Sequence, residues 1–296
     1  MTLIELITAQ SARLKQAGVS FGHGTGNAFD EAAWLVLWAL GMGLDVLEEQ
    51  ASTVVTTEQQ AVAEALITRR IETRVPAAYL TREAWLQNVP FYVDERVIVP
   101  RSYIAELLAD GEGSGTLDAW LSDRTHKVLD LCTGSGSLAV IAAMAFPEVL
   151  VDAADISADA LAVARINVDR HALGRRITLL HSDLLAAVRG PYDLIVCNPP
   201  YVTTRSMQTL PAEYRAEPAL ALAGGDDGMD LVRTILREAP PHMTNEAVLV
   251  LEIGHERGNF ERAFPRLEAA WLETSGGEDQ VVLLARSSLA AYRWTT

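Results

Sequence analysis

The sequence predicts an α/β protein in which helices cover both faces of a parallel sheet and a smaller helical unit precedes that sheet. From residue 127 onward, short apolar runs alternate with helical patterns, which is typical of parallel strands joined by helices. Residues 1–80 show helical periodicity alone, and residues 81–100 have extended character. We therefore expect a helical domain at 1–80, a β-hairpin linker at 81–100 and an α/β domain at 101–296.

The helical part should contain three helices. The first follows the apolar spacing of residues 3–14. The second begins at Asp30 and ends at Gly41. Thr57 can cap the third helix, with Gln60 as its capping-box partner.

Two polar features of this part need an interpretation. The segment at residues 22–26, Gly-His-Gly-Thr-Gly, resembles a phosphate loop, but no strand precedes it. We expect it to be a flexible connector with His23 exposed to solvent. Arg69, Arg70 and Arg74 form a basic cluster on the third helix, which we interpret as a solvated face or an RNA contact.

The α/β part should contain five apolar strands, at residues 128–132, 149–155, 177–181, 192–197 and 247–253. Helices are expected between them at 138–146, 158–171 and 227–238. Residues 111–116 should form a loop, and residues 271–285 a closing hairpin across Gly276 and Gly277. Ligands of such sheets bind beyond the carboxyl ends of the strands.

Composition limits the classes of function. The chain has 296 residues and a net charge of −15, which argues against sequence-specific DNA binding and favours a basic partner. Its two cysteines, Cys132 and Cys197, cannot build a disulfide framework or a four-ligand zinc site, and no metal is expected. The first residues lack the features of a signal peptide, and the apolar stretch at 34–44 is too short to span a bilayer. A cytoplasmic protein without a membrane partner is expected.

A glycine-containing loop follows the first predicted strand. Residues 130–136 read Asp-Leu-Cys-Thr-Gly-Ser-Gly, and Asp155 ends the next strand, where a ribose-binding acid is expected. The pattern Gly134-x-Gly136-x-x-Ala139 also fits a dinucleotide fingerprint, so NAD is an alternative. However, Asp130 would repel a pyrophosphate and attract an ammonium group. This favours S-adenosylmethionine.

The fourth strand ends in Asn198-Pro199-Pro200-Tyr201. The prolines remove two N–H donors and fix the backbone. The side-chain carbonyl of Asn198 and the backbone carbonyl of Pro199 could then accept both hydrogens of a planar –NH2 group, with Tyr201 flat against it. Two fixed acceptors orient the nitrogen lone pair and stabilise the positive charge that grows on nitrogen during methyl transfer.

These motifs together resemble those of class I methyltransferases, and within them the HemK/Prm family of N(5)-glutamine methyltransferases. The resemblance covers nearly the whole chain and includes residues 76–80, Val99-Pro100-Arg101 and Glu252-Ile253-Gly254. It implies a Rossmann-like domain joined by a hairpin to a helical domain that recognises a protein. Ser102 to Glu106, Cys132 in place of a glycine and the run at 210–218 are similar to the branch that acts on large-subunit ribosomal protein three.

The resemblance also implies roles for single residues. Asn198, Pro199 and Tyr201 would be catalytic, and Asn198, Pro199, Pro200 and Tyr201 would bind the substrate amide. The cofactor would be bound by Asp130, Cys132, Thr133, Gly134, Ser135, Gly136, Asp155, Ile156, Asp183, Leu184 and Asn198. For Asp183, a helix N-cap is a second interpretation.

The expected activity is methylation of a glutamine side-chain amide in a basic ribosomal protein, either free or in an assembling ribosome. The alternative is a nucleic-acid methyltransferase that acts on the amino group of a flipped adenine or guanine. Such an enzyme should display a basic face, which a chain with a charge of −15 does not suggest.

Overall fold

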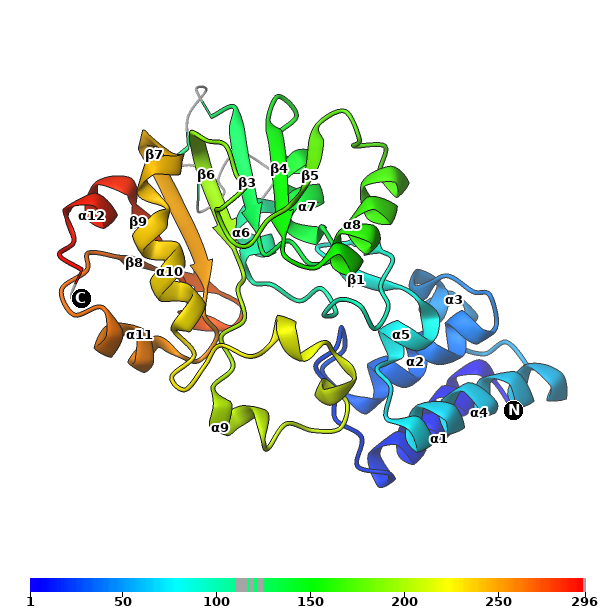
Figure 1. The fold of residues 1–296 in the computed structure, drawn as a ribbon. Coiled ribbons are helices and arrows are strands. Elements are labelled where there is room, and N and C mark those ends of the chain that lie inside the picture. Colours follow the sequence, from blue (N-terminus) through cyan, green and yellow to red (C-terminus); the bar gives the residue numbers. More distant parts are fainter. Residues whose placement is uncertain (110–116, 118–119, 122–124, 295–296) are drawn as a thin grey trace.

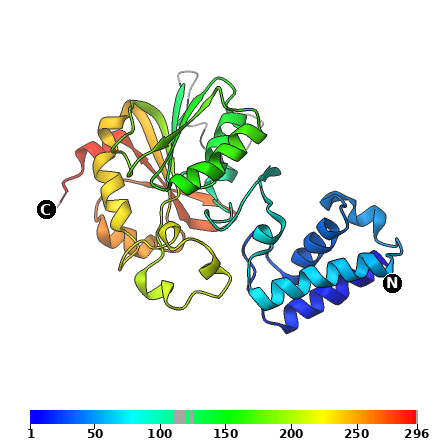
Figure 2. The same cartoon turned by 45° about the vertical axis from the view of Figure 1, so that its right-hand side comes forward.

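The computed structural model describes residues 1–109, 117, 120–121 and 125–294. The loop predicted at residues 111–116 lies outside these residues. The chain forms a helical part and a sheet-containing part, and Figure 2 shows the hairpin between them. The boundaries at residues 80 and 100 stay a prediction.

The helical part contains five helices within the described residues: α1 (Leu3–Gln16), α2 (Ala28–Ala39), α3 (Leu47–Gln50), α4 (Thr57–Thr73) and α5 (Ala77–Thr81). The predicted cap of α4 is wrong by one residue. Thr56 has an extended backbone, and its side chain accepts from the Gln59 N–H in a capping box. The pair Thr57 and Gln60 is therefore already inside the helix.

The hairpin is shorter than residues 81–100. It consists of β1 (Ala84–Leu86) and β2 (Val89–Phe91), joined by a turn in which Gln87 and Asn88 both have positive φ. Directly after β2, the Asn167 side chain accepts from the Tyr92 N–H at 2.7 Å and donates to the Tyr92 carbonyl at 3.0 Å. A side chain thus takes the hydrogen bonds that a longer strand would use.

The described part of the chain forms one seven-stranded sheet, in the order β5-β4-β3-β6-β7-β9-β8. Its strands are β3 (Lys127–Leu131), β4 (Leu150–Asp155), β5 (Ile177–His181), β6 (Tyr192–Cys197), β7 (Met243–Glu252), β8 (Ala270–Thr274) and β9 (Gly277–Ala285). The five predicted strands are confirmed and run parallel, and the predicted closing hairpin is β8 and β9. The last parallel strand begins earlier than predicted, at Met243.

Helices cover both faces of the sheet (Figure 1). One face carries α6 (Ile104–Ala109), α7 (Ser137–Ala145) and α8 (Ala158–Arg170), and the other carries α10 (Asp230–Glu238), α11 (Arg257–Ala263) and α12 (Arg286–Ala291). The buried side chains of the N-terminal helices belong to the same hydrophobic cluster as the first face. The helical part and the sheet therefore share one continuous core.

A long segment after β6, residues 202–224, reaches from the sheet to the helical part (Figures 1 and 2). It includes α9 (Thr204–Met207). Two of its buried glutamates form ion pairs with the helical part, and the Tyr214 ring packs on the His23 ring with centroids 4.3 Å apart.

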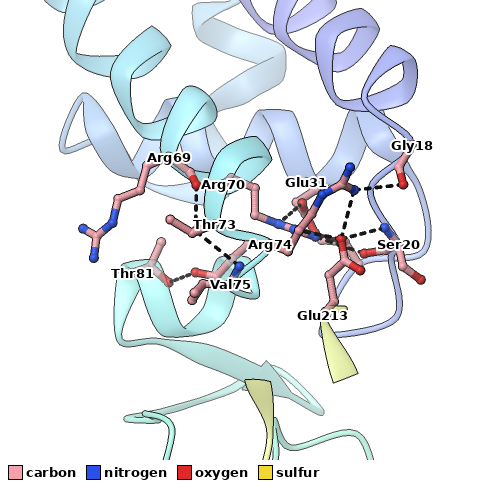
Figure 3. Close-up of polar contacts among 12 residues, drawn as sticks. Gly18, Ser20, Glu31, Arg69, Arg70, Thr73, Arg74, Val75, Thr81 and Glu213 are labelled. Carbon is pink, nitrogen blue, oxygen red and sulfur yellow. Dashed lines mark hydrogen bonds and ion pairs between the residues drawn. The ribbon is translucent and has the colours of Figure 1, made fainter. Parts of the chain in front are cut away.

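The first of these glutamates corrects the interpretation of the basic cluster. Arg70 is fully buried rather than solvated, with its Nε 2.8 Å from Glu31 and its Nη1 3.3 Å from Glu213. Arg74 contacts Glu213 at 3.4 Å, whereas Arg69 is exposed and points away from the network in Figure 3. Burial raises the pKa of Glu213, but bonds from the Ser20 N–H and Arg70 lower it overall.

The second glutamate corrects the interpretation of the segment at residues 22–26. His23 is buried, not exposed, and lies 3.6 Å from Glu217. Glu217 also forms a bidentate pair with Arg101, at 2.5 and 2.7 Å, and accepts from the Val99 N–H. Burial raises the pKa of Glu217, but the hydrogen bonds from Arg101 and the proximity of His23 outweigh burial and bring that pKa to about 2.

Candidate active site

The site lies where the order of strands reverses. The chain runs outward from β3 to β5 and then crosses to β6 on the other side of β3, so the carboxyl ends of β3 and β6 adjoin. Leu131 pairs with Cys197, which places the glycine loop beside the Asn-Pro-Pro-Tyr motif. Cys132 follows β3 and Cys197 ends the neighbouring strand β6, and burial raises the pKa of the Cys197 thiol.

A pocket of about 830 Å³, counting its open mouth, occupies this point. The predicted site residues that line it are Cys132, Gly134, Asp155, Ile156, Asp183, Leu184, Asn198 and Pro200. The other predicted residues, which are not part of this lining, are Asp130, Thr133, Ser135, Gly136, Pro199 and Tyr201.

The glycine loop turns sharply because three of its residues have left-handed backbones. Cys132, Gly134 and Gly136 have φ values of 61°, 54° and 79°. A Cβ on Gly136 would lie 3.1 Å from the Cβ of Ala164, so a side chain there would crowd helix α8. Cys132 takes the strained conformation with a side chain, which explains why a glycine is the usual residue there.

Asp130 lies beneath this loop and is fully buried. Its Oδ2 accepts from the Thr133 hydroxyl and, at 2.9 Å, from the Ala139 N–H. Its Oδ1 has no partner among the described residues, and burial raises the pKa of the carboxyl to about 7. A cationic donor would satisfy Oδ1, so this carboxylate fits the ammonium of S-adenosylmethionine and not a pyrophosphate.

Asp155 ends β4 in the wall of the pocket. Its two oxygens accept from the N–H groups of Gly134 and Ser157, both at 2.8 Å. A carboxylate has about four lone-pair sites, so two remain for the hydroxyls of a ribose. Burial raises the pKa of this group. Asp155 therefore holds the glycine loop in place and can still accept hydrogen bonds from the hydroxyls of a ribose.

The segment after β5 carries Asp183 and Leu184. Leu184 has a positive φ of 44°, and the residues that follow form a turn rather than a helix. Ser182 provides the side-chain oxygen there, because it accepts from the Ala187 N–H. The N-cap interpretation of Asp183 is therefore wrong, and this exposed carboxylate is available to a ligand in the pocket.

Tyr201 is held from behind by the Glu-Ile-Gly motif. Its hydroxyl is 3.5 Å from Oε1 of Glu252, and a Cβ on Gly254 would lie 2.6 Å from its ring. Glu252 also accepts from the Ser102 hydroxyl at 2.6 Å and from the Tyr103 N–H at 2.8 Å. Burial raises the pKa of Glu252 to about 7. The segment at Ser102, the Asn-Pro-Pro-Tyr motif and the Glu-Ile-Gly motif, which are distant in sequence, thus meet at the carboxyl group of Glu252.

Sequence reasoning missed part of the pocket wall. Residues 96–98 come from the linker, and Pro218, Leu220 and Ala221 from the segment that carries Glu217. It also missed Asn167, whose amide donates at 2.8 Å to the Ser135 carbonyl and so ties the glycine loop to Tyr92. The sequence shows Asn167 only as a polar residue between Ile166 and Val168 on a predicted helix.

The described part of the chain contains no group of three or more His, Cys, Asp or Glu side chains placed to hold a metal ion. None of the helices described has both the length and the apolar character needed to cross a membrane.

Comparison with known proteins agrees with this geometry. Residues 111–215 match the family model of the methyltransferase small domain. The chain is 52% identical to the ribosomal protein uL3 glutamine methyltransferase of Bordetella pertussis, over 97% of this chain and 96% of that protein. Its identity to the protein of the same name is 51% in Burkholderia pseudomallei, over 98% and 96%, and 47% in Neisseria meningitidis serogroup B, over 97% and 94%.

A solved structure of similar fold is the hMettl16 catalytic domain in complex with MAT2A 3'UTR hairpin 6. The TM-score is 0.50 and the sequence identity 11%, over 81% of this chain and 84% of that chain, so the likeness concerns the fold alone. The Rossmann-like class I methyltransferase fold expected from the sequence is confirmed. Because identity extends over nearly the full length of both chains, this protein belongs to the family of ribosomal protein uL3 glutamine methyltransferases.

Proposed function

We propose that this protein transfers the methyl group of S-adenosylmethionine to the side-chain amide nitrogen of a glutamine in ribosomal protein uL3. The observation that carries this proposal is the 52% identity to a relative of that name over 97% of the chain. The pocket supports it, because the glycine loop and Asn198 adjoin there.

The reactive end of the pocket is assigned to the residues after β6. S-adenosylmethionine supplies an electrophilic methyl group when bound. Asn198 would accept one amide hydrogen through its side-chain carbonyl, and Pro199 the other through its backbone carbonyl, with Tyr201 against the plane of the amide. Both acceptors would stabilise the positive charge that develops on nitrogen.

Asn198 positions the amide and is not a proton-transfer base. Its side chain has no acidic or basic group that titrates usefully. No proton has to leave before attack, since the methylated amide nitrogen can lose its proton to water afterwards. Asn198, Pro199 and Tyr201 therefore need only hold the amide and limit its motion.

The other site residues are assigned to the cofactor. Asp130 would stabilise its ammonium group and Asp155, beside Ile156, its ribose hydroxyls. Asp183 and Leu184 would contact the adenine. The loop residues Cys132, Thr133, Gly134, Ser135 and Gly136 would give the backbone its close approach to the methionine part.

We further propose that the substrate is basic and is met in the cytoplasm, as free protein or in an assembling ribosome. A charge of −15 on this chain would attract a cationic partner. The alternative, methylation of a nucleic-acid base, has the likeness to hMettl16 in its favour, but that likeness concerns the fold alone.

The test is mass spectrometry after incubation with isotope-labelled S-adenosylmethionine. Recombinant uL3, assembling large subunits and ribosomal RNA are supplied separately. One labelled methyl group on a glutamine of uL3 is the expected result. Label on an RNA base, with none on uL3, would establish the alternative instead.

A further inference from the structure

The helical part carries an open apolar groove, separate from the cofactor pocket. Its volume is about 730 Å³, counting its mouth, and its walls come from α2, the start of α3 and the hairpin. The large apolar side chains in its lining are Phe29, Trp34, Leu37, Leu44, Leu47 and Trp85. Phe29 is 39% exposed, Leu44 41% and Trp85 42%, so a sizeable apolar surface faces solvent here.

The stretch of sequence that supplies most of the groove is acidic. Between Lys15 and Arg69 the sequence has no Lys or Arg but contains Asp30, Glu31, Asp45, Glu48, Glu49, Glu58 and Glu64, of which Glu31 is buried against Arg70. Asp30 lies in the lining itself. Arg82, close to Trp85 in sequence, is already paired with Glu95 at 2.8 Å. An occupant that carries Lys or Arg beside an apolar anchor would complement this surface.

The groove also contains a polar group without a partner. Trp34 is 6% exposed, and its indole Nε1 has no hydrogen-bond partner among the described residues. An indole N–H is a donor only, so its complement is an acceptor such as a peptide carbonyl. A bound polypeptide offers such acceptors along its backbone.

One loop links the groove to the segment that reaches the active site. Gly24 and Thr25 line the groove, and the neighbouring His23 contacts Glu217. The residues after Glu217, including Pro218 and Leu220, line the cofactor pocket. The loop at the edge of the groove is therefore bound to the same segment that lines the cofactor pocket.

We propose that this groove, defined by Phe29, Trp34, Leu44 and Trp85, is a docking site for the protein substrate. Its occupant is a stretch of uL3 in which an apolar side chain is flanked by Lys or Arg. The proposal rests on the proposed function for the identity of the substrate. It adds a second point of attachment, away from the methylated glutamine.

The test measures binding and turnover with the full-length protein. Titration calorimetry with recombinant uL3 gives Kd, and steady-state methylation gives KM and kcat. Phe29→Ala and Trp85→Ala should each raise Kd and KM about tenfold or more, because truncated aromatic anchors dominate interface energies. The kcat and the Kd for S-adenosylmethionine should stay unchanged.

Trp38→Ala is the matched control, because Trp38 is an exposed aromatic of α2 that is not in the groove lining. It should leave Kd and KM for uL3 unchanged. The charge component is tested by salt: binding should weaken as NaCl increases, and Glu48→Gln combined with Glu49→Gln should reduce that dependence. Circular dichroism confirms that each variant is folded.

The proposal is overturned if both aromatic variants bind uL3 as tightly as the parent, or if the folded parent does not bind uL3. It is also overturned if sedimentation shows a dimer that Phe29→Ala dissociates, since the occupant is then a second copy. Equal methylation of uL3 by parent and variants would leave the proposed function intact and remove the docking site. If uL3 binds in the groove but is not methylated, the docking site stands and the proposed function is wrong.

Discussion

The ionisation of Asp130 should control the affinity for S-adenosylmethionine. Its Oδ2 already accepts two hydrogen bonds, and Oδ1 is buried without a partner in the part of the chain described. Burial raises the pKa of the carboxyl to about 7, so the free protein holds a proton there in mildly acidic solution. That proton must leave before the oxygen can accept from an ammonium group.

The expected magnitude follows from this pKa. Below pH 7, the Kd for S-adenosylmethionine should rise about tenfold for each pH unit, since one pKa unit corresponds to about 1.4 kcal/mol. Above about pH 8 the affinity should fall again, as the α-amino group of the cofactor loses its proton. Affinity should therefore be highest between these values.

The stability of the free protein should change in the opposite sense. The folded state binds this proton more tightly than the unfolded state, whose carboxyl has an ordinary pKa of 3.8. The contribution of Asp130 is then fully present below about pH 4. It falls by about 1.4 kcal/mol of unfolding free energy per pH unit as pH rises towards 7.

The assay is titration calorimetry from about pH 5.5 to 8.5 with the parent and Asp130→Asn. The variant should lose the acid limb of the profile, and its affinity at pH 7.5 should fall by about 1.5–3 kcal/mol, the range for a hydrogen bond to a charged group. Glu252→Gln is the matched control, since Glu252 is also buried with a pKa of about 7, but both of its carboxyl oxygens already have hydrogen-bond partners. If Asp130→Asn keeps the acid limb and Glu252→Gln loses it, the reasoning about Asp130 is refuted.

Three substitutions test other parts of the structure. Asn198→Ala should raise the activation free energy of single-turnover methyl transfer by about 2–4 kcal/mol, with little change in the Kd for the cofactor. Asn198→Asp should keep partial activity. A parental rate for the alanine variant would contradict the two-acceptor site. Arg70→Met leaves Glu31 and Glu213 buried without their shared cation, so chemical denaturation should show that the free energy of unfolding falls by about 3 kcal/mol. A fall of less than about 1 kcal/mol would mean that water or Arg74 compensates for the lost guanidinium. Cys132→Gly should stabilise the fold by about 0.5–1 kcal/mol, because it relieves a left-handed φ of 61°; destabilisation would show that the thiol contributes more by packing.

The sequence by itself determined the features that depend on local periodicity and local motifs. Alternating apolar strands and helices from residue 127 predicted the parallel strands and their order along the chain. The position of the glycine loop and of Asn198 at strand ends placed both at one edge of the sheet, because parallel strands share that edge. Short-range errors, such as Thr57 for Thr56, arise because neighbouring residues of the same type compete for one cap.

Only the tertiary structure decided which polar side chains are buried. Arg70 looked like part of an exposed cluster, but its partner Glu213 is 143 residues away in the sequence. His23 is buried for the same reason, since Glu217 reaches it from the segment after β6. A buried charge is tolerated only where a partner of opposite charge meets it in space, and no local pattern reports whether a distant segment brings that partner.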